Sequence, residues 1–253
     1  MEILNRSYTN YISLGYFCSI ALDLEKLGLR DRSFPFDWCI TNFEGINSLI
    51  ENRFEDLFET DLLFQSSKNP SHYQNGKYNM QFFHDFNENS SLSSQLHDVK
   101  EKYDRRISRF FEEITKPTLF IRYISSEEKD SEGKSIELSY IENNISKISK
   151  QYKSFNPENE ILFIADESVQ SNIINIYHVP IDRNDNVSRN PLFSNDSLFN
   201  YFKNVNYLQR KKNLERYYLK EKSINSFLKK LSNKLKRILN KYFSKKYDHY
   251  QKY

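Results

Sequence analysis

Short apolar runs alternate along the chain with longer segments in which apolar positions recur at helical spacing. The apolar runs, which we expect to form buried strands, cover residues 11–15, 78–86, 117–124, 160–166 and 172–179. The segments of helical spacing cover residues 18–28, 42–58, 96–114 and 138–152. Alternation of this kind is typical of βαβ units, so the sequence predicts a three-layer α/β fold in which helices flank a largely parallel sheet.

One stretch between the first two predicted helices is incompatible with a helix interior. Pro35 in RSFPFDW, residues 32–38, lacks a backbone N–H and biases Phe34 toward extended geometry. We therefore expect a loop here, and either Thr41 or Asn42 as the N-cap of the next helix.

Charge divides the chain into two parts. Residues 208–253 carry 15 Lys/Arg and 3 Asp/Glu, whereas the preceding residues carry 22 and 31. The basic part also has apolar residues at helical spacing in SINSFLKKLSNKLKRILNKYF. The sequence therefore predicts an α/β catalytic domain over residues 1–207 and a C-terminal basic amphipathic helix over residues 208–253.

Several classes of protein are disfavoured by what the sequence lacks. Neither of the two common glycine-rich phosphate-binding motifs occurs, and no cysteine and histidine spacing indicates zinc. No stretch approaches about 18 continuous apolar residues, and the N-terminus does not resemble a secretory signal. We therefore expect a cytoplasmic protein without metal or cofactor. No specific nucleic-acid-binding motif accompanies the basic tail.

The stretch ISLGYFCSIALDLEKLGL, residues 12–29, has a pattern with catalytic potential. An apolar run meets Gly15, and Cys18 follows where helical spacing begins. The N–H groups and dipole at a helix N-terminus lower the pKa of a thiol and can hold an oxyanion, here through the N–H groups near Cys18 and Ser19. The alternative is that Cys18 is a buried structural cysteine, because free cysteines are often buried.

A nucleophilic cysteine requires a base, and five histidines are available. His84 is the best candidate because it lies near the end of an apolar run, and His178 is the second choice. An orienting carboxylate could be Asp85 or Asp37, although Asp85 should face away from His84 in a regular strand. Asp37 could instead accept hydrogen bonds that close its own loop.

Two further polar residues end predicted strands. Arg122 and Asp166 follow apolar runs, and ligands of parallel sheets bind at the carboxyl ends of the strands. Arg122 could bind a carboxylate or phosphate, and Asp166 a hydroxyl group or a metal ion. Polar residues are also common at strand ends without any such role.

In order along the chain, SLGYFC, GLRDRSFPFDW, FFHDF and LFIRY resemble a bacterial and viral family of putative papain-like cysteine peptidases, over about residues 11–165. The resemblance implies that Cys18 is a nucleophile and His84 its base. It also implies an alternative α+β papain-like fold, with a largely helical half and a barrel-like half. Members of the family resemble parts of surface-glycan biosynthesis systems.

The sequence leaves three functions open. The first is cysteine-dependent acyl chemistry on a peptide or amide. The second is a glycosyltransferase-type enzyme acting on a bacterial surface polysaccharide or a lipid-linked glycan, with a nucleotide-linked donor near Gly15, Arg122 and Asp166. The third is a membrane-associated scaffold. The first is favoured because the resemblance supports it; the substrate and the oligomeric state stay undetermined.

The basic tail leads to a prediction about membranes. A basic face opposite a Leu/Phe face is typical of a helix lying in a membrane interface, and each basic residue near an anionic surface contributes about 1 kcal/mol. We expect the full chain to co-sediment with anionic liposomes at low salt, and a 1–207 truncation to stay in solution. Equal partitioning of the two forms would contradict a membrane role for the tail.

Overall fold

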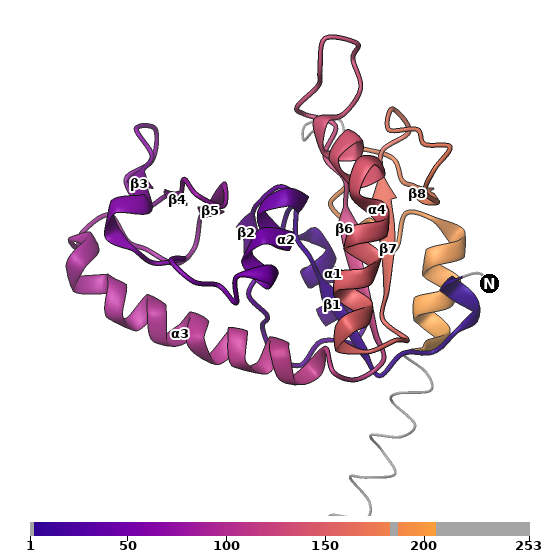
Figure 1. Ribbon diagram of the computed structural model, residues 1–253, viewed down its shortest axis with the longest axis horizontal. Helices are drawn as coiled ribbons and strands as arrows, with labels where there is room; N and C mark the ends of the chain where they lie inside the picture. The colour runs from indigo at the N-terminus through magenta and orange to yellow at the C-terminus, as the bar shows by residue number, and fades with distance from the viewer. Residues whose placement is uncertain (1–2, 183–186, 206–253) are drawn as a thin grey trace, which may run out of the picture. The chain divides into compact units, whose positions relative to one another are not determined.

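The computed structural model describes residues 3–182 and 187–205 (Figure 1). It contains two separate four-stranded sheets, one parallel and one antiparallel. The predicted basic helix over residues 208–253, and the boundary that precedes it, lie outside the described residues. In the described part of the chain, no helix is long and apolar enough to cross a lipid bilayer.

The parallel sheet has the strand order β1-β6-β7-β8, with β1 (Asn10–Ser13), β6 (Thr118–Tyr123), β7 (Glu160–Ala165) and β8 (Ile176–His178). Tyr11 pairs with Leu119, and Phe120 pairs with Ile161. Every residue of β6 is buried, as expected for a central strand that is covered on both faces. The predicted parallel sheet is therefore confirmed.

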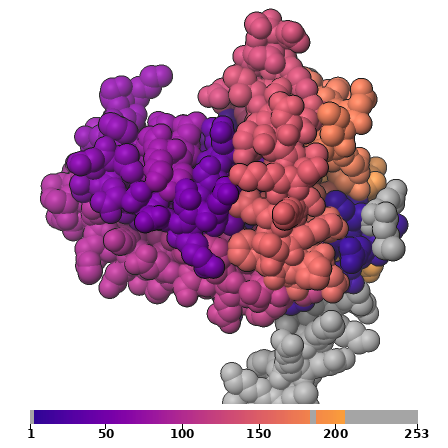
Figure 2. Space-filling view, in the orientation of Figure 1, coloured from indigo at the N-terminus to yellow at the C-terminus, as the bar shows by residue number. Residues whose placement is uncertain are grey.

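Helices cover both faces of this sheet. One face packs against α2 (Phe43–Glu51) and α4 (Ile136–Phe155), through buried residues such as Phe120 and Phe163. The other face packs against α1 (Ser19–Lys26) and a helical segment at residues 196–205. Figure 2 shows α2 and α4 side by side, where Gln151 Nε2 donates to the carbonyl of Asn47 at 2.9 Å.

The antiparallel sheet is a correction to the predicted fold. Its order is β2-β5-β4-β3, with β2 (Cys39–Ile40), β5 (Met80–Phe82), β4 (Tyr73–Asn75) and β3 (Leu63–Gln65). Strands of two or three residues are too short to show a period of two, so the sequence pattern predicted one long strand over 78–86 and did not reveal β2, β3 or β4. The fold is therefore mixed α/β with two sheets. It does not show the helical and barrel-like halves of the papain-like alternative.

Local chemistry sets the helix boundaries. Asn42 is the N-cap of α2 and accepts a hydrogen bond from the N–H of Gly45 at 2.8 Å, as one of the two predicted caps should. The helix ends at Glu51, before the expected Phe58, because Arg53, Phe54 and Asp56 all have positive φ angles. The described residues also contain two short 3₁₀ helices, η1 (Ile3–Asn5) and η2 (Thr60–Leu62).

The antiparallel sheet is held by α2 and by α3 (Leu92–Glu113), which runs along it (Figure 1). Tyr103 of α3 packs its ring against Phe58 and Phe82, with centroids 5.0 and 5.6 Å apart. Gly45 lets α2 approach the turn before β5, because a Cβ at this position would lie 2.0 Å from the carbonyl oxygen of Tyr78.

Arg122, the penultimate residue of β6, joins the two sheets. Its guanidinium group donates to the Glu137 carboxylate at 2.6 Å and to the carbonyls of Leu14 and Thr41 at 2.7 and 2.8 Å. Leu14 follows β1, Thr41 precedes α2, and Glu137 lies in the first turn of α4. One fully buried side chain therefore connects the parallel sheet, the antiparallel sheet and two helices.

We expect Arg122→Met to lower the free energy of unfolding by about 3–5 kcal/mol, because it leaves the Glu137 carboxylate buried without its partner. Urea unfolding followed by circular dichroism would measure the loss. The double variant Arg122→Met, Glu137→Leu should lose less than the single one. As a control, Arg105→Ala removes an exposed ion pair and should cost less than about 1 kcal/mol. A cost below that level for Arg122→Met would contradict the role of Arg122.

Candidate functional site

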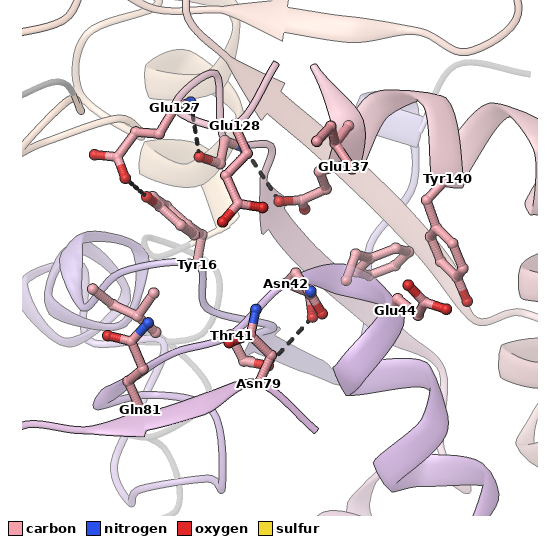
Figure 3. A pocket seen from close by; sticks show the side chains of 14 residues that line it. Tyr16, Thr41, Asn42, Glu44, Asn79, Gln81, Glu127, Glu128, Glu137 and Tyr140 are labelled. Atoms are coloured by element: carbon pink, nitrogen blue, oxygen red, sulfur yellow. Dashed lines mark hydrogen bonds between the residues drawn. The ribbon is translucent and has the colours of Figure 1, made fainter. Parts of the chain in front are cut away.

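A pocket of about 170 Å³ opens at the carboxyl ends of β1 and β6 (Figure 3). Its walls come from the turn after β1, from β2 and β5, and from the first turns of α2 and α4. Carboxyl ends of parallel strands are where ligands bind in sheets of this type. The position of the pocket therefore makes it the candidate binding site.

The pocket is acidic. Glu127 and Glu128 follow β6, Glu137 begins α4 and Glu44 begins α2 (Figure 3). Among the described residues, no Lys or Arg lines it. Of the four carboxylates, Glu137 alone is paired with a described cation, the Arg122 guanidinium. Within residues 3–182 and 187–205, no three His, Cys, Asp or Glu side chains are grouped as metal ligands.

Tyr16 forms one wall of the pocket, and Gly15 allows the turn that places it there. The Tyr16 hydroxyl donates to Glu127 at 2.5 Å, and burial raises the pKa of this phenol well above its usual range. Gly15 has a φ of 73°, which favours glycine, and a Cβ would lie 3.4 Å from Arg122 Nη1. Gly15 is buried, and its role in the structure is to form the turn after β1.

Cys18 is the N-cap of α1, as the sequence predicted, and its side chain is half-buried. Tyr16 lies two residues before it, so their Cα atoms are at most about 7 Å apart. Burial raises the pKa of Cys18 above its ordinary value, which opposes the activation expected at a helix N-terminus. Ser19, the next residue, is buried.

His84 lies just after β5 and is exposed. Its ring contacts Trp38 edge-on, with centroids 6.5 Å apart, and Trp38 lies 5.2 Å from the Arg30 guanidinium. Arg30 in turn donates to the carbonyl of Ala21 in α1 at 3.0 Å. His84 thus connects to α1 through two side chains, and no hydrogen bond joins Cys18 to a described histidine. His178 contacts the carbonyl of Val169 at 2.8 Å.

Asp37 is fully buried and closes the RSFPFDW loop. It accepts a hydrogen bond from the N–H of Phe34 at 2.9 Å and one from Arg30 at 3.1 Å. Burial raises the pKa of Asp37 to about 6, although Arg30 opposes the rise. The loop also reaches the β1 turn, because a Cβ on Gly15 would lie 3.5 Å from the carbonyl of Phe36.

Asp85 anchors the segment after β5 to α3. It accepts a hydrogen bond from the Tyr103 hydroxyl at 3.1 Å and pairs with Lys102 at 2.5 Å. Its side chain is almost completely buried. Asp85 therefore holds the position of the His84 segment, and no hydrogen bond joins it to the His84 ring.

The two polar residues expected at strand ends have different surroundings. Arg122 is fully buried, and its contacts are all with the protein, so it supports the pocket from beneath instead of facing a ligand. Asp166, after β7, is also largely buried and accepts from the N–H of Ser168 at 2.8 Å. Its hydrogen bonds to serines lower the pKa of the Asp166 carboxyl in spite of burial.

Known protein families include one that matches this chain. Residues 9–168 match the family described as "Putative papain-like cysteine peptidase (DUF1796)". The chain belongs to this family. It is also similar to "Uncharacterized protein R408" of Acanthamoeba polyphaga mimivirus, at 38% identity over 123 residues. That match covers 41% of this chain and 55% of the viral protein, so the chain spans about half the length of this relative. No solved structure matches.

The matched range includes most of the pocket and all of the motifs that carried the resemblance. Sequence reasoning did not find Tyr16, Thr41, Gln81 and the four pocket glutamates. Glu127 and Glu128 follow a buried strand, so the strand-end rule that selected Arg122 could have indicated them. Gln81 lies in a three-residue strand, and only the pairing with Ile40 of β2 brings it to the pocket.

The raised pKa of Asp37 predicts a pH-dependent stability. Its pKa is about 6 in the folded chain and about 3.9 when unfolded, so the neutral form favours folding. This stability is present below pH ~4 and is lost as pH rises through ~6. Relative to Asp37→Asn, the wild type should therefore lose on the order of 2 kcal/mol of unfolding free energy between those limits.

Urea unfolding of both forms between pH 4 and 7.5 would measure this difference. The matched control is Asp98→Asn, an exposed carboxylate in α3, which should show a constant difference from wild type. A difference between wild type and Asp37→Asn that stays constant across this range would contradict the prediction.

Proposed function

We propose that this protein performs acyl chemistry on a peptide or amide, with Cys18 as the nucleophile. The observation that carries the proposal is the position of Cys18: it caps α1, is half-buried rather than enclosed, and lies two residues from a wall of the pocket. Membership of a family described as cysteine peptidases supports the same chemistry.

In the proposed reaction, the Cys18 sulfur attacks the substrate carbonyl carbon and forms a C–S bond. The thiol proton passes to a base and from there to the leaving amine as the C–N bond breaks. The first N–H groups of an α-helix have no partners within the helix, so those after Cys18 are available to the oxyanion. Water then cleaves the thioester, which releases the acid and restores the thiol.

We propose His84 as the base, acting when substrate is bound. It is exposed, and among the described residues its ring is held by edge contact with Trp38 without a hydrogen bond, so its side chain has room to turn. The protonated resting thiol fits such a scheme, because the proton must leave as the substrate is attacked. Hydrogen bonds between catalytic groups are often absent in an unliganded enzyme and form only with substrate.

The charge of the pocket argues against a nucleotide-linked sugar donor. A diphosphate would meet carboxylates on several sides, and within residues 3–182 and 187–205 no Lys or Arg lines the pocket to neutralise it. Arg122, the residue expected to bind phosphate, is buried and already paired with Glu137. These observations favour acyl chemistry over the glycosyltransferase alternative.

A peptidyl vinyl sulfone, with adducts followed by intact mass, tests the proposal. At pH 7 we expect a single adduct on the wild type, none on Cys18→Ser and an unchanged one on Cys39→Ser, because Cys39 is enclosed in the core. The small reagent iodoacetamide should react slowly with Cys18 at pH 7 and faster only above pH ~8.5, since the pKa of the thiol is raised.

The role of His84 has its own readout in the same assay. His84→Gln should slow the vinyl sulfone reaction at pH 7 about 100-fold, within the usual range for loss of a general base, and leave the iodoacetamide rate unchanged. The matched control is His97→Gln, an exposed histidine of α3, which should change neither rate. Labelling that persists in Cys18→Ser would overturn the proposed function.

A further inference from the structure

The strongest feature outside the nucleophile is the imbalance of charge in the pocket. Glu44, Glu127 and Glu128 line it, and none of the three forms an ion pair with a described Lys or Arg. Glu137, at the back, has one oxygen on Arg122, while its other oxygen accepts only a long 3.4 Å bond from the N–H of Ser125. The hollow therefore carries a net negative charge with acceptors that are not fully used.

The arrangement of these carboxylates distinguishes between kinds of cation. They come from three separate segments and surround the hollow, as Figure 3 shows, instead of converging on one point. In the described part of the chain they do not form a group that could hold a metal ion. An organic cation with several N–H donors suits separated acceptors better than a small metal ion does.

The remaining walls fit the apolar stem of such a cation. Tyr16 and Tyr140 stand on different sides of the hollow, and Ile40 and Ile136 also line it (Figure 3). Side chains of Lys and Arg pack their methylene stems on apolar surface while the charged end reaches polar groups. The pocket thus provides apolar walls for the methylene stem and carboxylates for the charged end.

We propose that the pocket binds a basic side chain of the substrate, of the lysine or arginine type, close to the bond that Cys18 attacks. The position of this side chain beside the scissile bond rests on the proposed function, whereas its binding depends only on the pocket. The link between pocket and nucleophile is Tyr16, which lines the one and lies two residues from the other.

The test measures binding to the full chain carrying Cys18→Ala, by titration calorimetry at 50 mM salt. The probes are the Nα-acetyl methylamides of lysine, norleucine and glutamate, of which norleucine keeps the stem of lysine but lacks the ammonium group. We expect lysine to bind about tenfold more tightly than norleucine and glutamate to bind most weakly. The preference should shrink at 500 mM salt, because the pocket mouth is exposed and its charges are screened.

Two pocket variants and one control assign the effect to the carboxylates. Glu44→Gln and Glu128→Gln should each reduce the lysine preference about threefold and leave norleucine binding unchanged, as expected for partly screened charge pairs. Glu88→Gln removes an exposed carboxylate from the loop before α3 and should leave the lysine preference as it is. Circular dichroism would verify that each variant is folded.

The outcomes separate this inference from the proposed function. A lysine preference that falls in both pocket variants supports the basic-side-chain subsite, even if Cys18 does not react with the vinyl sulfone. Equal binding of lysine and norleucine overturns the inference, even if Cys18 is labelled. A lysine preference that both pocket variants retain in full also overturns it, because the charge would then lie elsewhere.

Discussion

The hydrogen bonds of Arg122 fix the three segments that meet above the parallel sheet. A guanidinium buried near the carboxyl end of a strand requires acceptors, and here they come from the end of β1, the residue before the N-cap of α2 and the start of α4. Any rearrangement of these segments would leave a buried charge without partners, which costs several kcal/mol. Arg122 also explains Gly15, since the turn after β1 passes directly over the guanidinium group. The geometry of the pocket is thus a consequence of satisfying one buried charge.

Two further buried carboxylates also hold segments around the site in place. Asp37 joins the RSFPFDW loop to Arg30, and Asp85 joins the segment after β5 to α3. Paired charges of this kind add little net stability compared with well-packed apolar residues, but breaking one pair is costly. They therefore restrict the loops to one arrangement more than they stabilise the fold as a whole. That restriction keeps Trp38 and His84 beside each other on the surface next to the antiparallel sheet.

The sequence predicted the long elements better than the short ones, for physical reasons. The strands β6 and β7 lie in continuous apolar runs bounded by helices of clear periodicity, and both were found. The antiparallel sheet was missed because its strands have two or three residues and are defined by pairing with distant segments. The same limit applies to the site. Cys18 was located correctly at the start of α1 from local pattern alone. The acidic pocket was not found, because its glutamates are separated in sequence and meet only in the folded chain.

Two opposing influences act on the Cys18 thiol. The dipole and free N–H groups favour the thiolate, but partial burial removes water, and the pKa of Cys18 is raised on balance. The N–H groups are then still unoccupied by a sulfur anion, so they can serve a charge that develops on the substrate instead. An enzyme of this kind would keep its nucleophile neutral at rest, and the N–H groups and dipole of the helix would stabilise the oxyanion. The carboxylates of the pocket, in turn, favour a cationic group on the substrate that enters it.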